Sequence, residues 1–496
     1  MASVLAGCTP GASAATHKVK VTATTAPAGR YQRLIVDKNT GGAAHGSIFY
    51  APRYATAIRP RGTLVGPTIA GPHLHTVYFQ NLPLNTRATD LRVQQYRGRP
   101  VLTYWRGLVG SHARVSGGGV DLILNQHYQV IRTVQSQVPG CPLDMHEFKL
   151  AKDARTGHDI AYIECYKQER VNATRVGGAR NQMIYDGIAQ GIDLVTNKLV
   201  FLFDSYKRVP LSDSYTRPTG SANNPWDWFH LNAVRPDTDG NIIISSRNTS
   251  TIYKVNRQTG AIIWRLGGKR SNFKMGQGTA FSWQHDPVPT GDNTYRVYDN
   301  AWNQIPGSRP QRARSHVLTI RLNQANHTAA LRADWSYPGV LAGALGNSQA
   351  LPNGDLLVNW GVQNRITEFD AHHKIVLDVH FPGHLYNTYR AYKYPWTGYG
   401  VGRPRLKISG RGRSRQGDVS WNGATTVARW VIRGGPSRKP GDLSRLGAIS
   451  WQNFHTGFRL SSWPAYVRVV ARDAHRRFLG MSVIQRAGSP KAAGSR

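Results

Sequence analysis

Three histidines occupy matching places in three short segments of this sequence, MHEFKL, FHLNAV and QHDPVP. In each segment one histidine, His146, His230 or His285, lies in an apolar run that leads to a turn and a second hydrophobic run. Asn232 lies two residues after His230, and Arg247 lies seventeen after it. None of these imidazole, amide and guanidinium groups carries a fixed negative charge. Together they can bind a tetrahedral anion. A sulfuryl or phosphoryl group can be held by the arginine and the asparagine and attacked by a neutral imidazole nitrogen.

Two other interpretations of the histidines are open at this point. Three imidazoles can bind zinc, although these lack the short spacing of a metal-binding helix and Arg247 would be an odd neighbour for a cation. A single histidine in an apolar strand is often a core residue whose hydrogen bonds are satisfied. Three histidines at equivalent positions of a repeat weaken that second interpretation, and we predict no metal ligand among them.

The elements that must position these residues are predicted to be β-strands. Residues 226–268 contain four apolar or alternating runs, separated by turns at Asp239-Gly240 and Thr259-Gly260. A four-stranded meander of about forty residues is the unit of a β-propeller blade, and the first strand of each blade lines a central channel. Weaker copies of this unit recur along the chain. We therefore predict a six-bladed β-propeller over residues 31–401, with five or seven blades as alternatives.

The sequence after this predicted propeller divides into three parts. Residues 402–418, rich in Gly, Arg and Ser, indicate a linker. Residues 419–486 show short alternating strands at the spacing of a small immunoglobulin-like β-sandwich, with Trp421 and Trp430 in its core. Residues 487–496 are predicted to be a disordered tail. The predicted fold class is all-β, which fits a composition with 51 glycines and 27 prolines.

The cysteines indicate a compartment outside the cytoplasm. Cys8 ends the run Leu5-Ala6-Gly7-Cys8, which has the form of a bacterial lipoprotein cleavage box. The segment before it is too short for a signal, so residues 1–30 are either a clipped signal with a lipidation site and a disordered tether, or the match is chance. Cys141 and Cys165 flank a predicted strand pair, and we predict a disulfide between them. The protein is thus expected to be secreted or lipid-anchored to the cell membrane.

The formal net charge of +36 indicates an anionic partner. The basic residues are scattered, with no basic helix, zinc knuckle or RNA-binding signature, so specific nucleic-acid binding is not expected. An anionic cell envelope or anionic small substrates explain the charge better. No apolar run is long enough to span a membrane. The sequence leaves the oligomeric state open.

The segments WFHLNAV, ISSRNTSTIYKVNRQTGAIIWRLGG and WQHDPV resemble the signature segments of the arylsulfotransferase family, in the branch common in actinobacteria and fungi. The resemblance implies a six-bladed propeller that transfers a sulfuryl group from a phenolic sulfate ester to another phenol. It also implies that the enzyme needs no cofactor, phosphoadenosine phosphosulfate included, and that a covalent sulfohistidine is the intermediate.

Carried over by motif, the resemblance gives each predicted site residue a role. His285 is the nucleophile that becomes sulfated, and His230 exchanges a proton with the phenolic oxygen. Asn232 holds a sulfuryl oxygen, Arg247 neutralises charge on the sulfuryl group in transfer, and His146 completes the anion pocket. The alternative function is a non-catalytic propeller at the cell surface that binds an anionic ligand or partner. A metal-dependent hydrolase is a third hypothesis.

Overall fold

The computed structural model describes most of the chain. Its described residues are 19–24, 33–54, 64–108, 118–302, 314–383 and 386–487. They divide into two compact units. The larger comprises Arg30–Val401 with Asn422–Thr425, and the smaller comprises Met1–Gly29, Gly402–Trp421 and Thr426–Arg496. Cys8, the predicted lipidation site, lies outside the described residues.

The fold is all-β, as predicted. The described residues contain one α-helix, α1 (Ser205–Arg208), and the short 3-10 turns η1 (Thr174–Val176), η2 (Leu211–Asp213), η3 (Gly361–Gln363), η4 (Gly412–Ser414) and η5 (Pro440–Asp442). Among these described residues, no helix is long and apolar enough to cross a membrane.

The strands of the larger unit form six sheets of four or five strands in the described part of the chain. The first three are β27 (Tyr386–Tyr394) with β3 (Ser47–Tyr54), β4 (Thr68–Ala70) and β5 (Thr76–Phe79); β6 (Thr86–Tyr96) with β7 (Arg99–Leu108), β8 (Gly119–Leu124) and β9 (Val130–Val134); and β10 (Leu143–Lys152) with β11 (Asp159–Val171), β12 (Gln182–Asp193) and β13 (Leu199–Asp204). Each is an antiparallel sheet.

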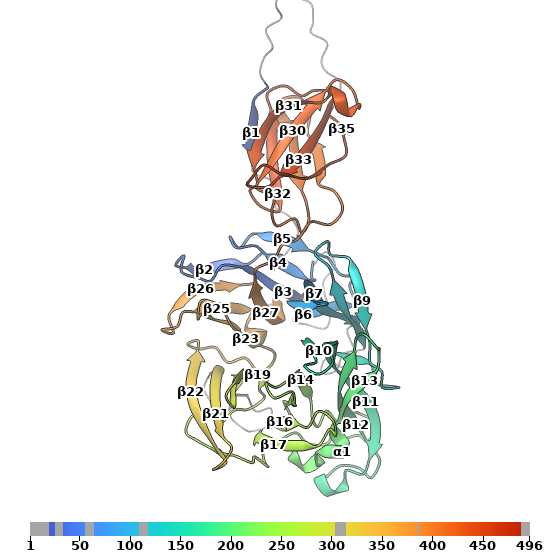
Figure 1. Cartoon of the computed structure of the whole chain (residues 1–496), viewed down its shortest axis with the longest axis vertical. Coiled ribbons are helices and arrows are strands. Elements are labelled where there is room, and N and C mark those ends of the chain that lie inside the picture. The colour runs from blue at the N-terminus through green and yellow to red at the C-terminus, as the bar shows by residue number, and fades with distance from the viewer. Residues whose placement is uncertain are drawn as a thin grey trace, which may run out of the picture. The chain divides into compact units, whose positions relative to one another are not determined.

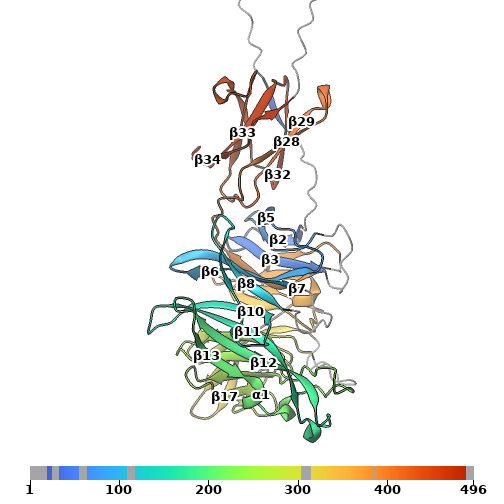
Figure 2. The same cartoon turned by 90° about the vertical axis from the view of Figure 1, so that its right-hand side faces the viewer.

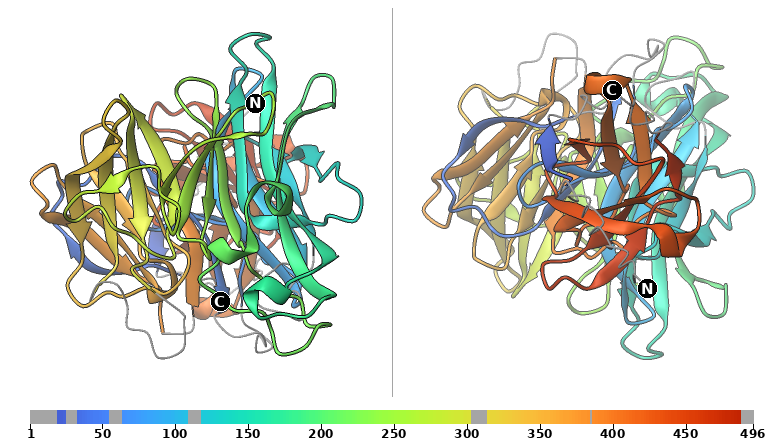
Figure 3. Two further views of the ribbon diagram at one scale, coloured as in Figure 1. Left: turned by 90° about the horizontal axis from the view of Figure 1, so that it is seen from below. Right: turned by 90° about the horizontal axis from the view of Figure 1, so that it is seen from above.

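The other three sheets follow in chain order. They are β14 (Leu231–Pro236) with β15 (Ile242–Ser246), β16 (Thr251–Val255) and β17 (Ile262–Gly267); β19 (His285–Gly291) with β20 (Thr294–Asp299), β21 (His316–Asn323), β22 (Thr328–Ser336) and β18 (Lys274–Met275); and β23 (Asn347–Ala350) with β24 (Leu356–Asn359), β25 (Arg365–Phe369), β26 (Ile375–His380) and β2 (Ile35–Asn39). Figure 3 shows the sheets of the larger unit standing side by side.

The six sheets surround a common centre. Strands β6, β10, β14, β19, β23 and β27 each contact the next one around this centre, and β27 closes the ring against β6. In Figure 1 these six strands lie around the middle of the larger unit. Two sheets join the beginning of the unit to its end, because β2 pairs with β26 and β3 pairs with β27. The first strand of each sheet is therefore the one that can carry residues into the centre.

The segment 226–268 illustrates why the sequence forms these sheets. Its four runs become β14 to β17, and both predicted turns hold a glycine with positive φ, Gly240 at 83° and Gly260 at 67°. The first strand begins only at Leu231. His230 has a φ of 55°. That left-handed conformation interrupts the extended backbone, so the strand begins after it.

The predicted disulfide is confirmed, because Cys141 and Cys165 are bonded with their Cα atoms 5.4 Å apart. Leu143 pairs with Cys165 across β10 and β11, which brings the two cysteines close together. The bond is buried against Ile188.

The smaller unit consists of two facing sheets (Figure 2). One is β1 (Val21–Thr24), β32 (His455–Leu460), β29 (Gln416–Ser420) and β28 (Arg405–Ser409); the other is β31 (Ser444–Ser450), β30 (Arg429–Gly435), β33 (Tyr466–Arg472) and β34 (Phe478–Met481), with β35 (Gln485–Arg486) also paired to β33. Trp430, Val467 and Val469 are buried in the core, whereas Trp421 is only partly buried.

Two boundary predictions were wrong. Residues 402–418 are not a linker, because β28 and the start of β29 form a ladder there, for example between Leu406 and Val419. The tether predicted within residues 1–30 contributes β1, whose Val21 pairs with Leu460. Apolar side chains alternate with basic or small polar ones in both segments, and this alternation is enough for an edge strand although the composition resembles a linker.

Candidate active site

The first histidine lies in an irregular part of its strand. Between Leu143 and Phe148 the register of β10 against β11 shifts, so residues 144–147 bulge away from the ladder. The backbone N–H of His146 donates to Asp144 Oδ1 at 3.2 Å, and its ring Nδ1 also contacts that carboxylate. A bulge of this kind turns side chains away from the regular alternation of the strand. His146 is buried at 4% exposure.

His230 owes its position to its left-handed backbone and to Asp227. The backbone N–H of Arg247 donates to the carbonyl of His230 at 2.9 Å, which fixes this turn. Nδ1 of His230 lies 2.5 Å from Asp227 Oδ2. Because a carboxylate accepts, Nδ1 carries the proton and Nε2 is left as an acceptor in the neutral ring. This is the arrangement of a proton-exchanging histidine oriented by a carboxylate.

The partners of His285 determine the position of its proton. Asn300 Nδ2 donates to the carbonyls of Ala342 and Leu345 at 2.7 and 3.0 Å, so its Oδ1 must be the atom that faces His285. Nδ1 of His285 lies 2.7 Å from that oxygen and 3.1 Å from the carbonyl of Trp283. Two acceptors require a proton on Nδ1. The lone pair of Nε2 is therefore the nucleophilic position of this ring.

The predicted residues come together around Tyr389, at the start of β27. The ring centroids of His146 and His285 lie 5.3 and 6.4 Å from that of Tyr389, and the rings of His146 and His230 lie 5.1 Å apart. Arg247 follows β15, and its Nη2 lies 3.8 Å from Asp227 Oδ2. Each of the three histidines, and Arg247, is more than nine-tenths buried. The structure thus gathers the three histidines and the arginine into one cluster.

Asn232 joins two of the elements that carry this cluster. Its Nδ2 donates to the carbonyl of Gln284 at 2.8 Å, which links β14 to the residue before His285. Asn232 thus has a structural role that sequence reasoning did not anticipate.

Burial keeps both candidate catalytic histidines neutral. The pKa of His230 is lowered to about 4, mainly by burial and then by Arg247, while Asp227 opposes the shift. Burial lowers the pKa of His285 well below its usual value, with Asn300 opposing and Arg247 adding to the effect. Burial is thus a larger cause of both shifts than the charge of Arg247.

These shifts predict that the free energy of unfolding falls as the pH drops from about 6.5 to 4. A histidine with a lowered folded pKa binds more protons when unfolded in that window, so protonation favours unfolding. Once the pH is well below 4, the shifted pKa of His230 alone lowers the free energy of unfolding by about 3 kcal/mol. Urea titrations at a series of pH values measure this. The His230→Gln variant should show a shallower decline, and an identical decline would contradict the shift.

A network of buried charges lies next to the cluster, on the innermost strands. Glu147 accepts from Arg92 and Arg390 through Oε1, at 2.5 and 2.9 Å, and from Arg235 through Oε2 at 2.8 Å. Asp286 also accepts from Arg235 at 2.8 Å. Burial alone raises the pKa of a carboxyl, yet the three guanidiniums hold the pKa of Glu147 well below its ordinary value. We call Glu147, Arg92, Arg235, Arg390 and Asp286 the central ion network.

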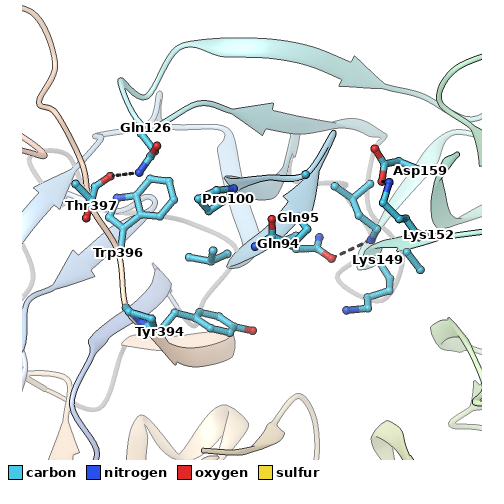
Figure 4. Close-up of a pocket in the computed structure, with 15 residues that line it drawn as sticks. Gln94, Gln95, Pro100, Gln126, Lys149, Lys152, Asp159, Tyr394, Trp396 and Thr397 are labelled. Atoms are coloured by element: carbon cyan, nitrogen blue, oxygen red, sulfur yellow. Dashed lines mark hydrogen bonds and ion pairs between the residues drawn. The ribbon is translucent and has the colours of Figure 1, made fainter. Parts of the chain in front are cut away.

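A cavity lies near the other end of β10. It has a volume of about 840 Å³ and is lined by residues that include Lys149, Lys152, Gln94, Tyr394 and Trp396 (Figure 4). Burial, with Arg92 and Arg235, lowers the pKa of Lys149 to about 8. No predicted site residue lines this cavity. The central ion network lies on the innermost strands, between the end that carries the histidine cluster and the end that carries this cavity.

Sequence reasoning missed the partners that orient the histidines. Asp227 lies three residues before His230, and that spacing within WDWFH was a usable signal. Asp144 lies two residues before His146 in the same way. Nothing in the sequence indicated Tyr389, because it comes from a strand more than a hundred residues after His285.

Comparison with known proteins shows a match to one protein family. The sequence matches the model of a family described as arylsulfotransferase (ASST) over residues 92–382. That range contains all five residues predicted for the site. No curated protein matches the chain.

Similar solved structures include three at low identity. A protein of unknown function from Bacteroides caccae is 8% identical, with a TM-score of 0.40, covering 70% of this chain and 98% of that chain. A protein from Lactobacillus plantarum is 12% identical, with a TM-score of 0.35, covering 84% and 99%. Virginiamycin B lyase from Staphylococcus aureus is 10% identical, with a TM-score of 0.29, covering 76% and 98%.

Proposed function

Because this chain belongs to the arylsulfotransferase family, we propose that it transfers a sulfuryl group from a phenolic sulfate ester to a phenol through a sulfohistidine on His285, without phosphoadenosine phosphosulfate. The observation that carries the proposal is the neutral, buried imidazole of His285, whose Nδ1 is held by Asn300 Oδ1 and whose Nε2 is left to attack. No cofactor enters the proposed reaction.

In the first half of the reaction Nε2 of His285 forms a bond to sulfur while the bond from sulfur to the phenolic oxygen breaks. Transfer of this type has a loose transition state, so positioning and charge stabilisation matter more than a strong nucleophile. Arg247, one N–H of Asn232 and His146 hold the sulfuryl oxygens. Phenol then leaves, and the second phenol takes the sulfuryl group from His285, which gives ping-pong kinetics.

His230 moves the proton. The bound sulfate ester brings a negative charge beside it and, together with Asp227, favours its imidazolium form when the donor is bound. Nε2 of His230 then protonates the leaving phenolate and later removes the proton of the acceptor phenol. The two half-reactions use the same nitrogen in opposite directions.

Replacing Asp227 with asparagine should lower kcat by about a hundredfold or more, with KM little changed. An amide can donate to Nδ1, which moves the ring proton of His230 to Nε2 and leaves no base for the acceptor. The loss should be larger for donors whose leaving phenol is more basic, because these need the proton more. Steady-state kinetics with a series of substituted phenyl sulfates measures this.

Asp334→Asn is the matched control. Asp334 accepts from His316 Nδ1 in the same kind of pair, on β21 and β22. It should leave the dependence on the leaving group unchanged. Equal dependence in Asp227→Asn and the native protein would refute the role of His230.

The fold and location follow from the same proposal. We propose that the six sheets are the blades of a six-bladed β-propeller and that the smaller unit is an immunoglobulin-like sandwich. An exported protein, secreted or anchored through Cys8, fits the buried disulfide, since such bonds persist in oxidising compartments. The net charge of +36 fits attraction to an anionic envelope.

The alternative is a non-catalytic propeller that binds an anion at the histidine cluster. Incubation with p-nitrophenyl sulfate and phenol separates the two functions. Nitrophenolate release that needs the acceptor, with one sulfuryl group added to a peptide containing His285, supports the enzyme. Absence of transfer with many different donors supports the binding protein. Release of nitrophenolate by transfer to water, without an acceptor, supports a hydrolase.

A further inference from the structure

A second cluster lies behind His146. One ligand atom each of Asp144, His146 and Glu164 falls within 4.8 Å of the others. Asp144 and His146 come from the bulge of β10, and Glu164 comes from β11, opposite that bulge. All three side chains are at most 5% exposed. The sulfuryl-transfer mechanism uses only the face of His146 that points toward the other histidines.

Glu164 lacks the partners that a buried carboxylate needs. It is fully buried, and neither of its oxygens has a hydrogen-bond partner among the described residues. Its Oε1 lies 3.8 Å from His146 Nδ1, on the side where Asp144 also lies. A buried carboxylate without a donor or a counter-charge is strongly disfavoured. An additional positive group on this side of His146 would satisfy it.

The charge of the surroundings points the same way. Asp144 and Glu147 act on Glu164 as like charges, and Asp121 adds another. Asp121 is itself fully buried, with neither oxygen hydrogen-bonded within the described residues. Arg390 is the cation that acts on Glu164, and it is already bonded to Glu147. The charged groups that act on Glu164 are thus three carboxylates and one guanidinium.

We propose that Asp144, Glu164 and His146 bind a divalent metal ion, through one carboxylate oxygen each and through Nδ1 of the imidazole. Two carboxylates and one imidazole are ligands that suit ions such as Mn²⁺ and Zn²⁺. This is a different site from the three-histidine site considered from the sequence. His146 is the one imidazole among the three grouped side chains of the described residues, and His230 and His285 are not part of that group.

Metal binding would also fix the proton of His146. With Nδ1 bound to the ion, the ring proton must lie on Nε2, which then donates rather than accepts. A donor at Nε2 suits a sulfuryl oxygen, whereas a lone pair there would repel it. This consequence rests on the proposed function, but the metal site itself does not.

Metal content tests the site directly. Untagged protein is produced in medium supplemented with Mn²⁺ or Zn²⁺, and metal per chain is measured by elemental analysis, followed by Mn²⁺ titration monitored by electron paramagnetic resonance. We expect about one ion per chain. Glu164→Gln should weaken binding at least about tenfold. Glu169→Gln is the matched control, because it removes the same charge from the partly exposed end of the same strand.

The outcomes separate this site from the proposed function. His285→Ala should bind the metal normally even though it cannot transfer a sulfuryl group. If Glu164→Gln fails to fold, Asp144→Asn provides the same comparison. Native protein that contains no metal and does not bind Mn²⁺ or Zn²⁺, or equal binding by Glu164→Gln and Glu169→Gln, overturns the proposal. A proton on Glu164 is then what neutralises the cluster.

Discussion

Alanine in place of His285 should lower the rate of sulfuryl transfer by at least about a thousandfold. The variant loses the nitrogen that forms the covalent intermediate, and no other group in the cluster has the same geometry. The Nδ1 atoms of His230 and His146 face the carboxylates of Asp227 and Asp144, whereas Nδ1 of His285 faces a neutral amide. The measurement is acceptor-dependent release of nitrophenolate from p-nitrophenyl sulfate.

His316→Ala is the control for this variant. His316 is also a buried histidine in the larger unit, and it contacts Asp334 rather than the cluster. It should retain transfer even if it is less stable. Intact mass after addition of the donor should show one sulfuryl group on the native protein and on His316→Ala, and none on His285→Ala. Near-normal turnover by His285→Ala would show that another group is the nucleophile.

Glutamine in place of Glu147 should lower the free energy of unfolding by about 3–5 kcal/mol. The substitution preserves the shape of the side chain but removes the charge shared by Arg92, Arg235 and Arg390. Three buried guanidiniums would then depend on the remaining carboxylates of the innermost strands. Urea unfolding monitored by tryptophan fluorescence measures the loss.

Glu169→Gln again serves as the control, because its side chain is partly exposed and forms a surface pair with Lys167 at 3.6 Å. We expect it to change the free energy of unfolding by less than about 1 kcal/mol. Equal midpoints for Glu147→Gln and Glu169→Gln would contradict the view that the central ion network stabilises the fold.

Local patterns predicted the strands and much of the site. In residues 226–268 alternation and two glycine turns specify a meander, and repeats of the same pattern placed His146, His230 and His285 in or next to the innermost strands. Cys141 and Cys165 could be paired because the register of one hairpin fixes their separation. Each of these inferences depends on residues that are near one another in the chain or that repeat.

The remaining features depend on pairings between distant segments. Glu147, Arg235 and Arg390 look like solvent-facing positions of alternating strands, and only closure of the ring buries them together. Val21 and Leu406 lie in segments whose composition resembles linkers, and only the partner strands make them part of a sheet. Asn347 exchanges two hydrogen bonds with the backbone of Ala391, which belongs to a different strand.

The pairing of β2 with β26 and of β3 with β27 has a consequence for biosynthesis. Both strands pair with partners that are synthesised more than three hundred residues later. The unit therefore cannot complete its hydrogen bonding until nearly all of it has been synthesised. Contacts at such sequence separation slow folding and leave unpaired strand edges exposed in the nascent chain. Truncation before Tyr386 should therefore yield an aggregating product rather than a smaller soluble one.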